Sequence, residues 1–297
     1  MKVFVTGASG FVGTAVVREL IGAGHKVLGL ARSEASAHAI AAAGGEVLRG
    51  DLEDPDSLRS GARDSDGVIH AGFVHDFSRF AEVCEIDRVA IETMGSVLAG
   101  TGKPFIVTSG TALVRPGTLA TEDMVSAHDV RKFPRVSESA GLAFADQGVR
   151  AMAIRLSPSV HGEDDKHGFV PILIGTARQK AVSAYIGEGL NRWNAVHRLD
   201  AAVLYRLMLE KGQAGMRYHA VGDEAITLRS VAEAIGKHLD LPVVSLRVEE
   251  APEHFGWFIN FVSIDAPASS KATQEALGWK PVHSSLAEDL ESGIYFK

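Results

Sequence analysis

Three observations on this 297-residue chain predict an α/β fold with a doubly wound parallel sheet and a small C-terminal substrate lobe. Short β-branched segments alternate with segments of helical spacing through the first half, and this alternation requires crossovers between parallel strands. Three glycines stand between the first predicted strand and the first predicted helix. After residue 157 the alternation loosens, so a smaller second unit is expected there.

The predicted strands of the first half occupy residues 2–6, 25–30, 45–50, 67–72, 104–109 and 150–157. Helices fit between them. Val12, Val16 and Leu20 recur with a period of 3.6 residues, and Asp54-Pro55 supplies an N-cap and a first-turn proline for a further helix. The longest stretch of apolar helical periodicity is 76–100. These elements predict one nucleotide-binding domain over residues 1–157.

The second half, residues 158–297, is expected to form mainly the lobe that covers a substrate. Residues 158–168 are polar and are predicted to be a loop, a helix is expected at about 169–180, and Thr227 is a predicted N-cap. Some strands from about 181–222 are expected to join the first domain, so the domain boundary is discontinuous.

Composition excludes several classes of protein. The formal charge is −7 and no Lys/Arg run stands out, which argues against nucleic acid as a partner. No apolar window is long enough to span a membrane, and the N-terminus lacks the pattern of a signal peptide, so a cytoplasmic protein is expected. Cys84 is the single cysteine, and its place in an apolar helical pattern predicts a buried thiol.

The glycine segment Gly7-Ala8-Ser9-Gly10-Phe11-Val12-Gly13 follows a predicted strand and opens a predicted helix. In such a segment the first glycine makes a tight turn, the second lets the backbone approach a pyrophosphate, and the third lets the helix pack closely. The helix N-terminus then offers N–H groups and partial positive charge to the phosphates. The segment therefore predicts a Rossmann-type site for a nicotinamide dinucleotide.

Together with Thr6, this segment resembles the T-G-x-x-G-x-x-G signature of the extended short-chain dehydrogenase/reductase superfamily. The likeness covers nearly the whole chain, because five further segments resemble family motifs: Asp51-Leu52, Val68–Gly72, Val107–Ser109, Arg155–Gly162 and Val196–Asp200. The resemblance implies that the cofactor also contacts Asp51, Leu52, Ala71, Gly72, Thr108, Ser109, Pro158 and Val160.

The end of the second predicted strand bears on the choice of cofactor. An acidic residue there would bind the ribose 2′-OH of NAD, but the chain reads Leu30-Ala31-Arg32-Ser33. Arg32 suits a 2′-phosphate, and Ser33 adds a possible hydrogen bond. Glu34 is a weaker signal for NAD. NADP is therefore preferred, with NAD as the alternative.

The resemblance fails at the family's catalytic pair, a tyrosine followed four residues later by a lysine. None of Tyr185, Tyr205, Tyr218 and Tyr295 has a lysine at that spacing. In the expected region Pro134 or Arg135 takes the place of the tyrosine, and Glu138 or Ser139 that of the lysine. Gly110 takes the place of the family's serine. The chain therefore resembles the atypical members of the superfamily.

Candidate catalytic groups are His161, Ser109 and Thr111. His161 follows the sixth predicted strand, at the edge where open sheets bind ligands, and histidine suits proton transfer near neutral pH. The hydroxyls of Ser109 and Thr111 are expected near the same edge, although bonding within the loop is the commoner role. Arg135 could bind a cofactor phosphate or a substrate carboxylate.

Other candidate groups receive no catalytic assignment. His75, His128 and His167 fall in predicted loops and are not ranked. The run from His161 to His167 crowds acids and imidazoles, but a solvated acidic loop is favoured over a metal site. Aromatic residues at helical spacing near the C-terminus fit either a substrate pocket or core, with core or subunit contact slightly favoured; these are Phe255, Trp257, Phe258 and Phe261.

These features predict an NAD(P)-dependent oxidoreductase that acts on a small carbonyl or alcohol. A non-catalytic NADP-binding sensor is the first alternative, and an epimerase or dehydratase acting on nucleotide sugars is a further one. A homodimer is also expected. The resemblance implies pairing through two long helices at about 76–100 and about 134–148, which carry more apolar residues than one buried face needs.

Overall fold

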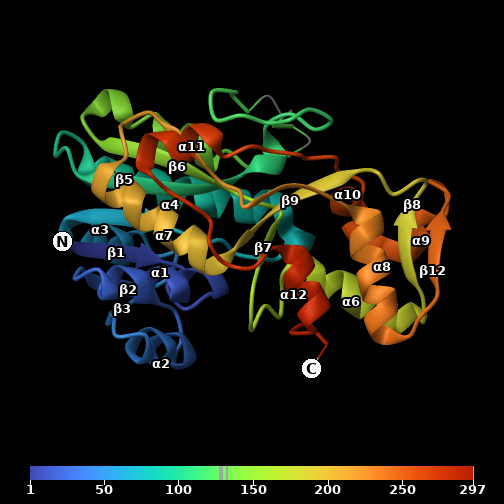
Figure 1. Ribbon diagram of the computed structural model, residues 1–297. Helices are drawn as coiled ribbons and strands as arrows, with labels where there is room; N and C mark the ends of the chain where they lie inside the picture. Colours follow the sequence, from blue (N-terminus) through green and yellow to red (C-terminus); the bar gives the residue numbers. More distant parts are fainter. Residues whose placement is uncertain (127–129, 132, 297) are drawn as a thin grey trace.

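The computed structural model describes residues 1–126, 130–131 and 133–296. Its main sheet has seven parallel strands in the order β10-β6-β5-β4-β1-β2-β3 (Figure 1). The bounds are β1 (Lys2–Thr6), β2 (Lys26–Ala31), β3 (Glu46–Arg49), β4 (Gly67–His70), β5 (Pro104–Gly110), β6 (Arg150–Leu156) and β10 (Arg217–Ala220). Chain order reverses between β1 and β4, which opens a crevice at the carboxyl edge of the sheet. The predicted doubly wound fold is confirmed.

Helices cover both faces of this sheet because successive side chains of each strand point to opposite sides. Val3 and Val5 of β1 pack with the helices of one face, whereas Phe4 packs with those of the other. The first face carries α1 (Phe11–Gly22), α2 (Glu34–Ala42), α7 (Arg198–Lys211) and α11 (Lys271–Leu277). The second carries α3 (Pro55–Arg63), α4 (Phe80–Leu98) and α5 (Ser137–Leu142).

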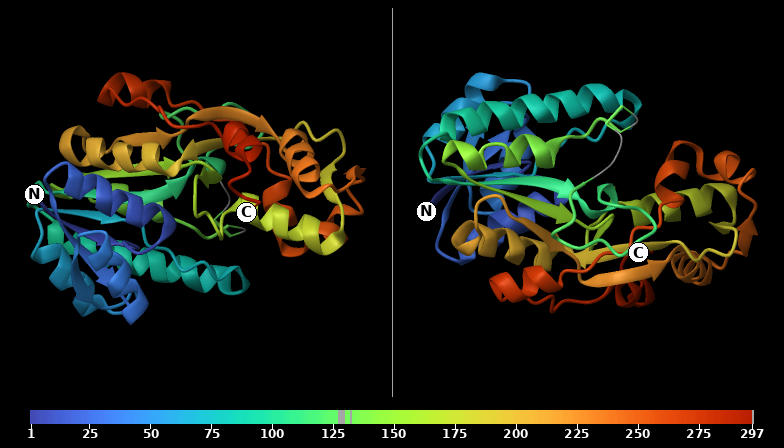
Figure 2. Two further views of the ribbon diagram at one scale, coloured as in Figure 1. Left: turned by 60° about the horizontal axis from the view of Figure 1, so that its bottom comes forward. Right: turned by 90° about the horizontal axis from the view of Figure 1, so that it is seen from above.

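The C-terminal lobe stands beyond the carboxyl edge of the sheet (Figure 2). It contains a three-stranded sheet of β11 (Asp223–Thr227), β9 (Arg192–His197) and β7 (Ser159–His161), and a pair of β12 (Val243–Leu246) with β8 (Ser183–Ile186). Its helices are α6 (Phe169–Lys180), α8 (Leu228–Leu239), α9 (Ala251–Phe255), α10 (Ile259–Val262) and α12 (Leu286–Ser292). Most of them share a separate apolar core.

The six strands predicted for the first half are confirmed, as are the helix at 169–180 and the capped helix that follows Asp54. Two expectations are wrong. Residues 158–168 are not all loop, since β7 pairs there with β9. The second long helix, expected at about 134–148, is the short α5 followed by one 3₁₀ turn at Ala145–Gln147.

Three further expectations have definite outcomes. Of the strands at 181–222, only β10 joins the main sheet. Thr227 is the N-cap of α8, as predicted, and accepts a hydrogen bond from the Ser230 amide. Cys84 is buried, and burial raises the pKa of its thiol to about 11. Among the described helices, none combines the length and apolar composition that a transmembrane segment needs.

Candidate active site

The glycine turn between β1 and α1 is closely packed at two of its glycines and open at the third. Gly7 has a φ of +68°, and a Cβ there would lie 2.7 Å from the Cα of Gly72. A Cβ on Gly13 would lie 1.9 Å from the carbonyl oxygen of Gly7, so the helix can start here only with glycine. A Cβ on Gly10 would meet only the Gly7 oxygen, at 3.3 Å. The space in front of Gly10 therefore remains open.

This open side is the N-terminus of α1. Gly10 is the N-cap and has no side chain to accept a hydrogen bond from the first turn. Ser9, Phe11 and Val12 are half-buried around it. Ala71 and Gly72, which follow β4, lie against Gly7 as the sequence motifs imply. The arrangement has the shape and the partial positive charge that a pyrophosphate needs.

The adenosine end of the predicted site lies at the carboxyl ends of β2 and β3. Arg32 is exposed there, and no ion pair of its side chain occurs in the described residues. Glu34, the signal for NAD, is instead 2.5 Å from Arg49 Nη2. Ser33 caps α2 and accepts a hydrogen bond from the Ser36 amide. Asp51 accepts one from the Glu53 amide, and half-buried Leu52 packs against the core beneath.

A chain of buried polar side chains begins under this turn, and sequence reasoning missed it. Thr6 Oγ1 accepts a hydrogen bond from the Gly72 amide and lies 2.7 Å from His70 Nδ1. His70 Nε2 lies 3.1 Å from Asp87 Oδ1. The other oxygen of Asp87 accepts a hydrogen bond from Ser137 Oγ at 2.5 Å. Every group is satisfied if the His70 ring carries its proton on Nε2 and Thr6 donates to Nδ1.

Arg135 lies at the outer end of this series of hydrogen-bonded side chains. Its Nε donates to Ser137 Oγ at 3.1 Å, its Nη2 donates to the Thr108 carbonyl at 3.2 Å, and its guanidinium lies 4.3 Å from the centre of the Phe73 ring. Burial alone would raise the pKa of Asp87, but the hydrogen bonds from His70 and Ser137 and the charge of Arg135 hold that pKa below its ordinary value. A cation is thus fixed at the carboxyl ends of β4 and β5.

The two hydroxyls predicted as catalytic candidates differ in their surroundings. Thr111 is buried, and its hydroxyl accepts a hydrogen bond from Asn194 Nδ2 at 3.0 Å. Asn194 Oδ1 at 3.1 Å and the Leu156 carbonyl at 3.3 Å are alternative acceptors for its single proton. Its hydroxyl is therefore fully engaged. The Ser109 hydroxyl is nearly buried on β5 and makes no hydrogen bond within the described part of the chain.

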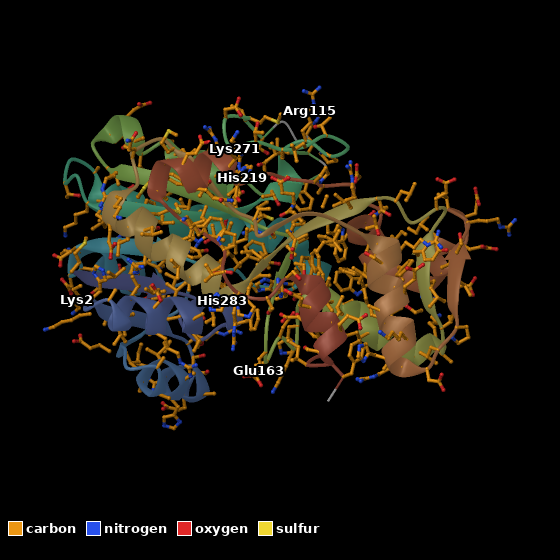
Figure 3. All side chains as sticks on the ribbon, viewed as in Figure 1. Lys2, Arg115, Glu163, His219, Lys271 and His283 are labelled. Carbon is orange, nitrogen blue, oxygen red and sulfur yellow. The ribbon has the colours of Figure 1, made fainter. Side chains whose placement is uncertain are left out.

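Glu138 of α5 lies in a buried ion-pair cluster. Arg155 of β6 donates twice to the Glu138 carboxylate, at 2.6 and 2.7 Å, and Arg217 donates to it at 2.7 Å. Burial opposes ionisation of Glu138, yet the two arginines keep its pKa below the ordinary value. His219 completes the cluster where β10 meets α11 (Figure 3), with its Nε2 3.1 Å from Arg155. These groups tie α5, β6 and β10 together.

His161 is not presented to the crevice as the sequence suggests. The ring has no exposed surface, and its Nδ1 lies 2.6 Å from Asp289 of α12. Its Nε2 is buried and has no hydrogen-bond partner among the residues that the structure describes. His197 packs edge-on against it, and His283, labelled in Figure 3, stacks on His197. The predicted solvated loop is therefore wrong at His161, although Glu163 is exposed as expected. A catalytic role for His161 stays a prediction. His128 lies outside the described residues.

Pro158 and Val160 are half-buried just beyond β6, beside the same edge of the sheet. The four tyrosines do not all lie in the C-terminal lobe. Tyr205 and Tyr218 pack into the core of the main domain. Tyr205 is buried beneath β5, 2.7 Å from Thr108 Oγ1, and burial raises its pKa strongly, so it is a poor proton donor.

The C-terminal aromatic residues differ in their surroundings, and the substrate-pocket role stays a prediction. Phe258 is buried in the core of the lobe, as is Phe255. Trp257 is 54% exposed and stacks on Phe77 at 5.2 Å, and Phe261 meets the same ring edge-on at 5.5 Å. This contact joins the lobe to the segment after β4, which also carries Phe73.

Comparisons with known proteins agree with this architecture. A 2-alkyl-3-oxoalkanoate reductase of Stenotrophomonas maltophilia is 27% identical over 79% of this chain and 74% of its own length. An uncharacterized protein of Schizosaccharomyces pombe is 53% identical and matches 100% of both chains. The structure of dTDP-glucose 4,6-dehydratase from Streptomyces venezuelae, solved with NAD bound, has a TM-score of 0.79 at 18% identity and covers 99% of this chain and 96% of its own. Since the family model also matches residues 3–221, the chain belongs to the NAD dependent epimerase/dehydratase family.

Proposed function

We propose that the protein is a nicotinamide-dependent oxidoreductase that interconverts a small carbonyl compound and its alcohol. The observation that carries this proposal is the glycine turn, which is closed at Gly7 and Gly13 and open at Gly10 in front of a helix N-terminus. A dinucleotide pyrophosphate requires that shape. The name of the Stenotrophomonas relative, a reductase of 3-oxo acids, supports reductive chemistry.

The residues at the adenosine end fit NADP better than NAD. Arg32 is exposed, while Glu34 is held by Arg49. A guanidinium recognises a 2′-phosphate by paired hydrogen bonds, whereas an NAD site places a carboxylate on the ribose 2′-OH. We therefore expect a lower Kd for NADPH than for NADH, which titration of both cofactors measures. A Kd for NADPH no lower than that for NADH would contradict the preference.

The bound nicotinamide would supply or accept the hydride, and the protein must manage the charge on the substrate oxygen. When a hydride adds to a carbonyl carbon, the electron pair of the C=O π bond moves to oxygen, which must be stabilised at once. We assign this role to Arg135, which Thr108 and Ser137 hold at the carboxyl end of β5. A guanidinium does not usefully release a proton, so water supplies the final proton to the alkoxide. Ser109, the residue after Thr108 on β5, offers a second donor.

The test is the oxidation of NADPH, followed by its absorbance across a panel of ketones and aldehydes that includes 3-oxo acids. We expect turnover of at least one member of the panel. A protein that binds NADPH and reduces none of them would instead be a cofactor-binding sensor. Conversion of a nucleotide sugar without net consumption of NADPH would indicate an epimerase or dehydratase.

A further inference from the structure

Helix α7 lies alongside α1 on the same face of the sheet, and the two helices run in the same direction (Figures 1 and 2). Two contacts fix their register. At one end the guanidinium of Arg198 lies 4.8 Å from the centre of the Phe11 ring, and these are the first residues of the two helices. Further along, Arg206 Nε lies 2.6 Å from Glu19 Oε1. The N-terminus of α7 therefore stands beside the phosphate cradle.

Arg198 differs from Arg206, the other arginine of this contact, in having no anionic partner in the described part of the chain. Arg206 is paired with both Glu19 and Glu210. Arg198 forms no ion pair within the described residues, and its Nε is buried without a hydrogen-bond partner. Asp200, the acid nearest in the chain, already accepts hydrogen bonds from His283 and the Val282 amide. Leaving a buried guanidinium N–H without an acceptor is costly, so the unpartnered Nε indicates a missing hydrogen-bond acceptor, and the positive charge favours an anion in that place.

The geometry points to Arg198 as a ligand of the cofactor's pyrophosphate, an assignment that rests on the proposed nicotinamide cofactor. Phe11 supports the flat guanidinium at the mouth of the cradle, next to the position where Gly10 leaves the N-terminus of α1 open. A planar fork of N–H donors matches phosphate oxygens. The N-terminal ends of α1 and α7 add partial positive charge at the same place.

His197 positions Arg198 without adding to its charge. Its Nδ1 accepts a hydrogen bond from the Leu199 amide and so caps α7. Burial and the neighbouring His161 lower the pKa of His197 to about 4, so its ring is neutral near pH 7. Arg198 is therefore the cation that this end of α7 contributes to the cradle.

The test compares Arg198→Met with the parent protein by calorimetric titration of NADPH and of ADP-ribose, which contains the pyrophosphate but no nicotinamide. Methionine keeps apolar cover over Phe11 and removes the donors. We expect a Kd about tenfold to a hundredfold higher for both ligands and a weaker dependence of binding on salt. Arg198→Lys should recover part of the lost affinity. The matched control is Arg206→Met on the same helix, which should leave both affinities unchanged.

Three outcomes would overturn the assignment. Affinities within twofold of the parent in a folded Arg198→Met protein would show that Arg198 only covers Phe11. An equal loss in Arg206→Met would show that α7 as a whole, and not this side chain, supports binding. If the parent binds neither ligand, the proposed cofactor is wrong and the assignment fails with it, whereas a parent that binds normally leaves the proposed function intact whatever the variants do.

Discussion

At the scale of single residues, the glycines of the turn are required for different reasons. A side chain at Gly10 would project into the open side of the turn, where its only close neighbour is the Gly7 oxygen at 3.3 Å. We expect Gly10→Val to fold and to lose dinucleotide binding, because the side chain occupies the space that the pyrophosphate needs. Calorimetry measures the affinity and thermal unfolding measures the fold. Unchanged cofactor affinity in a folded Gly10→Val protein would place the cradle elsewhere.

Gly13→Ala provides the contrast. Its Cβ would lie 1.9 Å from a backbone oxygen, so α1 has to move away from the strand. We expect this smaller substitution to lower the free energy of unfolding by about 2 kcal/mol or more, as overpacking does. The Tm and the cofactor affinity should fall with it. A Tm equal to that of the parent would show that the turn yields more easily than its geometry indicates.

Arg135 and His161 lead to different expected phenotypes. Arg135→Gln removes the cation at the carboxyl edge of the sheet, and we expect kcat to fall about 10²-fold or more, as loss of one oxyanion-stabilising donor does, with little change in cofactor affinity. Added guanidinium should restore part of the activity of Arg135→Ala. A kcat close to that of the parent would exclude Arg135 from the reaction.

His161→Ala should act mainly on stability. The ring is buried and bonded to Asp289 across the lobe, so its loss leaves a buried carboxylate without that partner. The sequence alone predicts instead that His161→Ala lowers kcat more than Tyr185→Phe does. Steady-state kinetics on both variants, each checked for NADPH binding, separate the two expectations.

Among the site residues, the sequence could predict only those that share a short local motif. The glycines are recognisable because strand, turn and helix follow one another within a few residues. The series of hydrogen-bonded side chains Thr6, His70, Asp87 and Ser137 could not be recognised in the sequence. Its members are up to about 130 residues apart and follow no spacing rule. Likewise, nothing local indicated that His161 would meet Asp289.

At the scale of elements, α5 is held to the sheet by a buried ion pair. Glu138 accepts hydrogen bonds from Arg155 of β6 and Arg217 of β10. We expect Glu138→Gln to lower the free energy of unfolding by about 3–5 kcal/mol, since it leaves the buried Arg155 without its anion. Glu233→Gln, which breaks an exposed pair with Arg229, should change it by about 0.5 kcal/mol or less. Urea unfolding of both variants measures the difference, and equal effects would contradict it.

The elements that the sequence misplaced are those defined by distant partners. Residues 159–161 are a strand because β9, about 35 residues later, pairs with them. The stretch at 134–148 has the apolar residues of a helix, but Gly141 packs against Val107 and Gly148 adopts a φ of +73° that ends the segment. Strand periodicity in the first half, by contrast, is a property of each segment alone.

At the scale of the whole molecule, the homodimer stays a prediction. Several apolar residues of α4 that suggested a second buried face, Ile91, Met94 and Leu98, are buried in this chain's own core. Its outer side presents Arg88, paired with Glu85 and Glu92, and the 38% exposed Val89. We still expect a dimer through α4, with a sedimentation mass near twice 31.5 kDa at micromolar concentration. Val89→Glu should dissociate it, and a parent that sediments as a monomer would refute the dimer.

Global stability should depend on pH through His219, which is fully buried between β6, β10 and α11. Burial, together with the charge of Arg155, lowers its pKa to about 4, although Glu122 and Glu138 act in the opposite direction. The unfolded chain, with an ordinary histidine pKa of about 6.5, then binds the proton more readily. The neutral His219 therefore contributes fully to the free energy of unfolding above about pH 6.5, and this stabilisation is lost as the pH falls towards 4.

We expect the free energy of unfolding to be about 2 kcal/mol lower at about pH 5 than at about pH 7.5 from this group alone. His219→Gln should reduce that difference, because glutamine can accept the hydrogen bond from Arg155 and does not titrate. His38→Gln, at an exposed site on α2, is the matched control and should leave the difference unchanged. Denaturant unfolding at the two pH values measures all three proteins. Asp87 and Glu138 have lowered pKa values, so their protonation lowers the free energy of unfolding only at more acidic pH. They therefore do not mask the difference between the two pH values. An unchanged pH difference in His219→Gln would show that His219 is not the source of the effect.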